Sequence, residues 1–333
     1  MLVLLAATAS LLVFIAPRLD RPVAWTLGTA LALLAGFRTG GFDYEEYLLN
    51  IDGIRAAAGA DWLTRLFFAK DPLFLFIVEF AGTFTENPRP VFLAVAAISV
   101  FTKVAATAAI PRSRTYFLAI YMVFLAPGLE FAAIRAGMAI GLLMMALYGV
   151  SRWRAGWAVL AVLGHYSVAM AWMGRLLVTH RWSIATPLLL AAPLALPVLA
   201  AFGQEDLRYA TYFENPGTLY ALSLPILTVC AMAGLYAARR KLHRPERIVS
   251  AEAMMASAIC VAATLVLALP FVTVSYRIME IAWALMLAQW LALGTLGSRH
   301  LLARIASGGM LLAALTLTNV LGEKWMILAE MAL

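Results

Sequence analysis

The chain has 333 residues, of which 64% are hydrophobic and only 13% are charged, whereas soluble domains are roughly 45 to 50% apolar and about 25% charged. This composition excludes a water-soluble globular protein. The 25 basic residues outnumber the 18 acidic residues, but they stand mainly in short segments between apolar runs, where they indicate membrane topology rather than nucleic-acid binding. We therefore expect an all-α, polytopic integral membrane protein, with about 10 to 12 transmembrane helices in a single transmembrane domain over 1–333.

The apolar runs come close to the roughly 20 residues that a bilayer requires. They cover 2–16, 22–37, 72–84, 90–110, 115–133, 136–150, 155–178, 184–203, 218–237, 251–275, 278–296 and 301–321. The first run lacks a basic segment before it, and Pro17 spoils a cleavage site, so we expect an uncleaved first span.

Basic segments between the runs are expected to be cytoplasmic. Two cytoplasmic segments must be separated by an even number of membrane crossings, and an odd number of apolar runs lies between some of them. Some runs therefore do not cross the membrane fully. The run 72–84 is too short, and 184–203 contains three prolines, which break helices. We expect roughly ten full crossings, with partial or broken segments between them and the N-terminus outside.

Two polar stretches are then external, the amphipathic segment 38–71 and the aromatic loop 204–217. In the first, Asp43 followed by Glu46 resembles a capping box. Apolar residues recur after it at helical spacing, at Tyr44, Tyr47, Leu48, Ile51 and Ile54. Asp61 begins a second expected helix, with an apolar face made by Trp62, Leu63, Leu66 and Phe67. Both are expected to lie at the membrane interface.

Several catalytic patterns are absent from the sequence. It contains no Walker A loop, no His-Glu-x-x-His, no Gly-x-Ser-x-Gly and no Asp-x-Asp, which argues against nucleotide-driven pumping, zinc proteolysis and metal-dependent use of nucleotide sugars. The two cysteines, Cys230 and Cys260, both lie in apolar runs and cannot build a zinc site or a disulfide framework. We expect neither a metal nor a cofactor.

Arg135 stands at the outer start of an expected helix that contains Gly137-x-x-x-Gly141, and such small residues allow close helix approach. A cation at a helix N-terminus opposes the macrodipole unless an anion binds there. Arg277 repeats this arrangement before 278–296, so both arginines are expected to converge on one anion. The alternative is that they snorkel or pair, with Glu130 and Glu280 as neutralising partners.

Two more ionisable residues interrupt apolar runs. His165 suggests a general base, a phosphate donor or a proton relay, and its alternative is a neutral histidine bonded to a neighbouring helix. Lys103, alone in 90–110, is expected to snorkel. In the loop 204–217, aromatic and acidic side chains would suit a sugar, although an interfacial aromatic belt is the favoured explanation. They include Tyr209, Tyr212 and Glu214.

The order of four short patterns resembles the EpsG family, which belongs with the Wzy-type bacterial polysaccharide polymerases. The patterns are Asp43-x-x-x-Tyr47, Asp71-Pro72, Ile134-Arg135-x-x-x-Ala139 and His165-Tyr166-Ser167-Val168-Ala169. The resemblance covers roughly 40–175, and Tyr276-Arg277 is similar to the family's C-terminal arginine region. Gly137 stands where the family often has glutamine.

The resemblance implies a membrane glycosyltransferase that joins undecaprenyl-pyrophosphate-linked oligosaccharide repeat units, at the periplasmic or outer face of the bacterial inner membrane. The product would be O-antigen, capsule or exopolysaccharide. Expected partners are these lipid-linked oligosaccharides, membrane lipids, and a chain-length regulator and flippase of the same pathway, with no nucleic acid. A polysaccharide ligase, a secondary transporter or flippase, and a structural membrane subunit are the alternatives.

The leaving pyrophosphate would be stabilised by preorganised cations, for which Arg135 and Arg277 are the candidates. His165 is the first candidate base and Asp43 the second, and a mechanism without a strong base is the third possibility. The expected substrate-binding residues are Arg135, Arg277, Tyr47, Asp71, Ser167, Tyr209, Tyr212 and Glu214.

Overall fold

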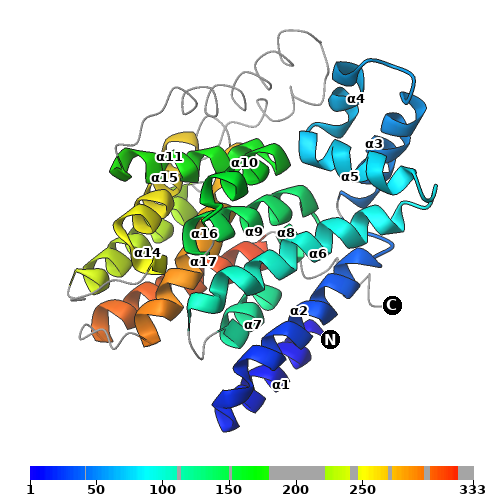
Figure 1. Cartoon of the computed structure of the whole chain (residues 1–333). Helices are drawn as coiled ribbons and strands as arrows, with labels where there is room; N and C mark the ends of the chain where they lie inside the picture. Colours follow the sequence, from blue (N-terminus) through cyan, green and yellow to red (C-terminus); the bar gives the residue numbers. More distant parts are fainter. Residues whose placement is uncertain are drawn as a thin grey trace. The chain divides into compact units, whose positions relative to one another are not determined.

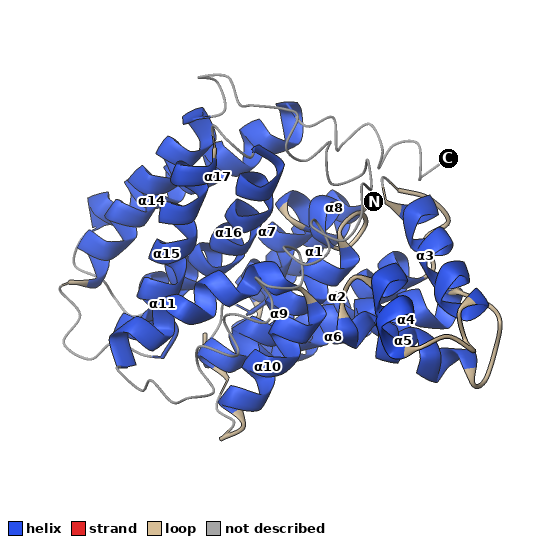
Figure 2. Ribbon diagram, turned by 90° about the horizontal axis from the view of Figure 1, so that it is seen from above, coloured by secondary structure: helices blue, strands red, loops and turns tan. Residues whose placement is uncertain are grey.

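The computed structural model describes residues 1–41, 43–110, 114–149, 152–179, 222–240, 247–268, 272–295 and 301–321. Within these ranges all regular structure is helical (Figure 2), as expected. The chain divides into two compact units. The first comprises Met1–Ala108, Arg114–His165 and Asn319–Leu333, and the second comprises Ala109–Ser113 and Tyr166–Thr318.

The helices of the first unit follow the predicted runs closely (Figure 1). They are α1 (Leu2–Ile15), α2 (Asp20–Gly36), α3 (Tyr44–Ala56), α4 (Trp62–Ala69), α5 (Pro72–Gly82), α6 (Arg89–Ala106), α7 (Arg114–Phe124), α8 (Ala126–Leu129), α9 (Ile134–Tyr148) and α10 (Arg154–Gly164). The expected run 115–133 is not one helix. It divides between α7 and α8, where Pro127 stands near the start of the new helix and has no N–H to continue the preceding one.

Helix α6 packs against α2 and α9 in the first unit, and nearly every residue of α9 is buried. Gly141 makes the closest approach, because a Cβ added there would lie 2.6 Å from the carbonyl oxygen of Ser99 on α6. A larger residue would force the two helices apart. The predicted small-residue contact is therefore confirmed at Gly141.

The second unit contains α11 (Ala169–Thr179), α14 (Ser223–Arg239), α15 (Ala251–Leu267), α16 (Val272–Thr295) and α17 (Leu301–Leu321) as far as Thr318. Helix α15 packs against α11 and α16. Gln289 on α16 donates to the Ala253 carbonyl oxygen at 2.9 Å, which satisfies a polar group inside this unit.

The expected continuous run 155–178 is broken at His165. Helix α10 ends at Gly164, His165 has extended backbone, and a short turn over Tyr166–Val168 precedes α11. The histidine therefore lies at a helix end rather than inside a helix, where its side chain is not confined to one helix face.

The external segment 38–71 forms the two predicted helices, α3 and α4. The apolar stripe of α3 is confirmed, since Tyr47, Ile51 and Ile54 are buried. The predicted capping box was wrong, because the Asp43 side chain makes no capping hydrogen bond. Asp61 does cap α4, accepting hydrogen bonds from the N–H groups of residues 63 and 64 at 2.9 and 3.1 Å.

The apolar face of α4 is largely open. Trp62 is 50% exposed, Leu63 67% and Phe67 40%. Ion pairs of Arg65 with Glu79 and of Lys70 with Glu46 hold α4 to its neighbours α5 and α3. An apolar face that is exposed beside charged anchors is typical of an interfacial helix, and that placement stays a prediction.

Among the described residues, one helix is long and apolar enough to cross a bilayer, Arg89–Ala106. Several other apolar helices are shorter, such as α1 and α9. The segments 184–203 and 204–217 lie outside the described residues, and the expected single domain and its crossings stay predictions.

Candidate functional site

Four of the residues that the sequence singled out come together in the first unit. Tyr47 lies on α3, Arg135 in the first turn of α9, His165 directly after α10, and Asp71 between α4 and α5. Lys70 ends α4 with a left-handed backbone, φ 63°, and Pro72 begins α5. This sharp turn places Asp71 between two helix ends, and its carboxylate is left to face other elements.

The Asp71 carboxylate joins an arginine and a histidine. One oxygen, Oδ2, lies 3.0 Å from Nη1 of Arg135, and the other, Oδ1, lies 3.6 Å from Nδ1 of His165. The first contact is an ion pair, whereas the second is longer than a hydrogen bond. Asp71 is only 3% exposed, so little water screens either interaction.

Arg135 is held by further contacts on its other sides. Its Nη1 donates to the carbonyl oxygen of Ala69 at 2.7 Å. Its guanidinium carbon lies 5.2 Å from the centroid of the Tyr47 ring and 5.6 Å from that of Phe74, which is within cation–π range. The guanidinium is therefore fixed in position before any ligand arrives.

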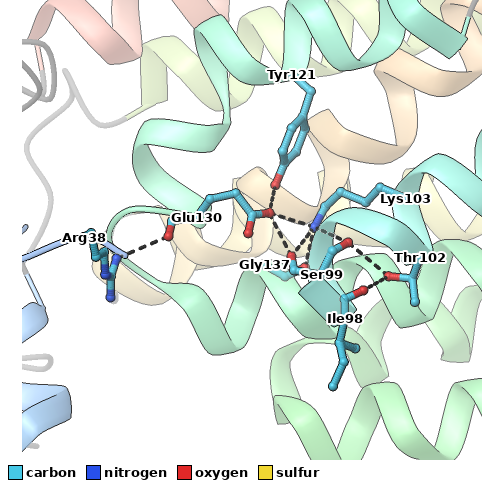
Figure 3. A network of polar contacts seen from close by, with 8 residues as sticks. All are labelled: Arg38, Ile98, Ser99, Thr102, Lys103, Tyr121, Glu130 and Gly137. Carbon is cyan, nitrogen blue, oxygen red and sulfur yellow. Dashed lines mark hydrogen bonds and ion pairs between the residues drawn. The ribbon is translucent and has the colours of Figure 1, made fainter. Parts of the chain in front are cut away.

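The structure corrects the expected partner of Arg135, which is Asp71 and not Glu130. Glu130 instead pairs with Lys103, whose Nζ lies 2.9 Å from Oε1 of Glu130 (Figure 3). Both side chains are fully buried. The expectation that Lys103 snorkels was wrong, because the ammonium ends in this internal network.

The buried network connects the elements around the start of α9. Lys103 donates to the carbonyl oxygen of Gly137 and to Ser99 Oγ, both at 2.6 Å, and the Tyr121 hydroxyl donates to Glu130 Oε1 at 2.6 Å (Figure 3). These bonds tie α6 and α7 to the first turns of α9. They hold the segment that carries Arg135, two residues before Gly137.

Asp43 and Arg277 occupy other places. Asp43 lies one turn before Tyr47, and its carbonyl oxygen accepts from the Tyr47 N–H at 3.0 Å. Arg277 belongs to the second unit and pairs with Glu280 at 3.2 Å, as the alternative interpretation expected. It does not stand at a helix start, because α16 begins five residues earlier at Val272.

The remaining predicted residues are not part of the cluster. Ser167 lies in the second unit, where its hydroxyl is buried and has no hydrogen-bond partner among the described residues. Tyr209, Tyr212 and Glu214 lie outside the described residues. The convergence of Arg135 and Arg277 on one anion stays a prediction.

Sequence reasoning missed Arg38, which lies in the segment after α2 and is 4% exposed. Its Nη1 donates to the backbone carbonyl oxygen of Glu130 at 3.2 Å. Burial lowers the pKa of Arg38, while Tyr47, Asp43 and Glu130 nearby act to raise it; an arginine nevertheless stays charged. As the first charge after an apolar run, Arg38 gave a weak signal that it shared with many loop residues.

Glu130 and Lys103 did carry a usable signal. Each is an isolated charge inside an apolar run, and the two have opposite signs. A buried pair satisfies both charges at membrane depth, whereas the sequence interpretation expected Lys103 to snorkel. Within the described ranges, no three metal-ligating side chains gather at one place. The groups that the cluster offers are a carboxylate, an imidazole, a guanidinium and a phenol.

The comparisons with known proteins identify one family. The sequence model of the EpsG family matches residues 24–296, which is most of the chain. No curated protein and no solved structure matches. The family is associated with exopolysaccharide polymerisation, and the match indicates a membrane protein of polysaccharide biosynthesis.

Proposed function

The chain belongs to the EpsG family, and from that premise we propose that it is a polytopic membrane glycosyltransferase of the bacterial inner membrane. It polymerises undecaprenyl-pyrophosphate-linked oligosaccharides into O-antigen, capsule or exopolysaccharide, with its site toward the periplasm. The composition supports a membrane location, as do the exposed apolar side chains of α1, where Leu4 is 72% and Phe14 is 75% exposed.

One observation carries the assignment of the site: the Asp71 carboxylate contacts Arg135 through one oxygen and His165 through the other. A carboxylate beside Nδ1 balances the positive charge that an imidazole gains when it accepts a proton in the reaction. The other ring nitrogen, Nε2, is then the atom that receives a proton. A guanidinium beside this pair provides a place for a phosphate group.

The reaction forms one bond to the anomeric carbon and breaks another. A hydroxyl oxygen of the acceptor repeat unit attacks the anomeric carbon of the donor chain, and the bond from that carbon to the pyrophosphate oxygen breaks with its electron pair. The hydroxyl proton passes to Nε2 of His165 and is later released to water. The products are a lengthened chain on the acceptor lipid and free undecaprenyl pyrophosphate.

Arg135 stabilises the negative charge that grows on the departing pyrophosphate. In the free enzyme Asp71 occupies part of this guanidinium, so the substrate competes with Asp71 for Arg135. This competition limits how tightly the ground state binds and leaves more of the interaction to the transition state, where the charge is greatest.

Other residues are proposed for binding. Tyr47 is proposed to contact the substrate beside the reacting groups, and Arg277 and Ser167 are proposed as further substrate-binding residues. The loop residues Tyr209, Tyr212 and Glu214 bind sugars of the repeat unit. Asp43 is the alternative base. Membrane lipids, a flippase that supplies the substrate and a chain-length regulator are the proposed partners.

The product tests this function. The purified chain is incubated in detergent with undecaprenyl-pyrophosphate-linked repeat units, without nucleotide or added metal, and the glycans are separated on a gel. A polymerase gives a ladder of lengths. A single capped species would indicate a ligase, and movement of intact lipid-linked sugar across proteoliposomes without any new bond would indicate a transporter.

A further inference from the structure

Arg38 is a buried cation whose guanidinium faces aromatic rings. Its guanidinium carbon lies 5.9 Å from the ring centroids of Tyr44 and Tyr47, and 5.2 Å from that of Phe92. Stacking against rings of this kind compensates part of the cost of removing the charge from water. It supplies no acceptor for the N–H groups.

Most of the hydrogen-bonding capacity of Arg38 is unused. One bond leaves Nη1 for the Glu130 carbonyl oxygen, while Nε and Nη2 are buried without a partner among the described residues. Asp43 and Glu130 are near enough to act on Arg38 electrostatically, but no described carboxylate forms an ion pair with it, and Oε1 of Glu130 is engaged by Lys103 and Tyr121 (Figure 3). The buried N–H groups of Nε and Nη2 therefore lack an acceptor.

Arg38 and Arg135 lie against the same aromatic ring. Their guanidinium carbons are 5.9 and 5.2 Å from the centroid of Tyr47, so the two carbons are at most about 11 Å apart. A pyrophosphate with each phosphoryl group bonded to its own guanidinium requires centres about 7 to 11 Å apart. The upper limit of the observed separation therefore allows one pyrophosphate to reach both arginines.

We propose that Arg38 is a second pyrophosphate-binding residue of the site, which takes one phosphoryl group through Nε and Nη2 while Arg135 takes the other. This inference rests on the proposed function, because it identifies the residue that distinguishes a lipid pyrophosphate from a lipid monophosphate. Both guanidinium groups lie against the Tyr47 ring, and one pyrophosphate neutralises both. The donor carries two phosphoryl groups, and two guanidinium groups match them.

The test measures binding of inorganic pyrophosphate and of inorganic phosphate to the full chain in detergent, by calorimetry and by ligand-induced thermal stabilisation. The variants are Arg38→Met, Arg38→Lys and Arg135→Met. Arg154→Lys is the matched control, since Arg154 also donates to backbone carbonyls of α9, those of Ala146 and Leu147 at its other end.

The wild type is expected to bind pyrophosphate more tightly than phosphate. Arg38→Met should weaken pyrophosphate binding roughly tenfold to a hundredfold and change phosphate binding little, as expected for losing hydrogen bonds to a charged group. Arg38→Lys keeps the charge but loses the paired N–H donors of the guanidinium, so its pyrophosphate affinity should lie between those of the wild type and Arg38→Met. Arg135→Met should weaken the binding of both anions, and Arg154→Lys should weaken the binding of neither.

Two results would overturn the role of Arg38 and leave the function standing. One is a pair of Arg38 variants that melt at lower temperature but keep the wild-type preference for pyrophosphate, which would make Arg38 a structural clamp on Glu130. The other is a wild type that polymerises yet binds both anions equally. A wild type that neither polymerises its substrate nor binds pyrophosphate would overturn the proposed function together with this inference.

Discussion

Arg135 and Asp71 form an ion pair of 3.0 Å at the meeting point of two helix ends, and the carboxylate is almost wholly shielded from water. Because of this pairing, Arg135, which is proposed to stabilise the leaving pyrophosphate, already has an anionic partner in the free enzyme. The pairing also means that removing the carboxylate has two separable effects, on the binding of the anion and on the proton transfer to His165.

Asp71→Asn should therefore bind pyrophosphate more tightly than the wild type and turn over more slowly. The amide no longer competes for Arg135, but it no longer balances the positive charge that His165 gains when it accepts the hydroxyl proton, so kcat should fall by about a hundredfold or more. Steady-state kinetics on the lipid-linked substrate separates the two effects. Glu79→Gln, which removes a half-exposed partner of Arg65, is the control and should change neither the pyrophosphate affinity nor kcat. Weaker pyrophosphate binding by Asp71→Asn would contradict the proposed competition between Asp71 and the substrate for Arg135.

The Lys103–Glu130 pair should behave as a unit. Lys103→Met alone leaves a buried carboxylate without its cation and should destabilise the protein by about 3 to 5 kcal/mol. The double variant Lys103→Met with Glu130→Gln removes both charges and should cost much less than the sum of the single changes. Thermal unfolding in detergent of the wild type, Lys103→Met, Glu130→Gln and the double variant gives a double-mutant cycle. Strictly additive effects of the two single changes would show that the pair is not coupled.

The contact of α6 with α9 should not tolerate a methyl group at Gly141. A Cβ there would overlap Thr102 Oγ1 and would lie 2.6 Å from the Ser99 carbonyl oxygen, so Gly141→Ala should cost about 1 to 3 kcal/mol through overpacking. Gly156→Ala is the matched control, because its nearest neighbour is 4.0 Å away. The control should be neutral or slightly stabilising, and equal melting temperatures of both variants would refute the close approach.

The cap of α4 should depend on pH. Hydrogen bonds from Thr64 and from backbone N–H groups lower the pKa of Asp61 below its ordinary value of 3.8. Its contribution to stability is thus fully present above about pH 3.8 and is lost as the pH falls through the lower folded value. The melting-temperature difference between the wild type and Asp61→Ala should be constant near neutral pH and shrink below pH 3.8. A difference that grows on acidification would contradict the assigned sign.

The helices were largely predictable from the long apolar runs. In a membrane no water is available to the backbone N–H and C=O groups of such a run, so they hydrogen-bond to each other within a helix. The breaks were harder to place. Pro127 was visible in the sequence as a helix breaker, whereas no strong breaker marks His165 within 155–178, and only tertiary packing decides that the chain is extended there.

The site was predictable in its members and not in its pairings. Arg135, Asp71, Tyr47 and His165 all stood out through the family patterns, but the partner of Arg135 was sought nearby in Glu130. The actual partner lies 64 positions away, and sequence spacing carries no information on contacts at such range. Arg38 was missed for the same reason, since its burial depends on rings contributed by α3 and α6.

The most direct test of the whole account compares the polymer ladder of the wild type with those of Arg135→Lys and His165→Gln, using Arg154→Lys as the control. We expect a full ladder from the wild type and the control. Both site variants should remain folded, and their rates should be at least about a hundredfold lower. Full ladders from folded Arg135→Lys and His165→Gln would contradict the assignment of the reaction to this cluster.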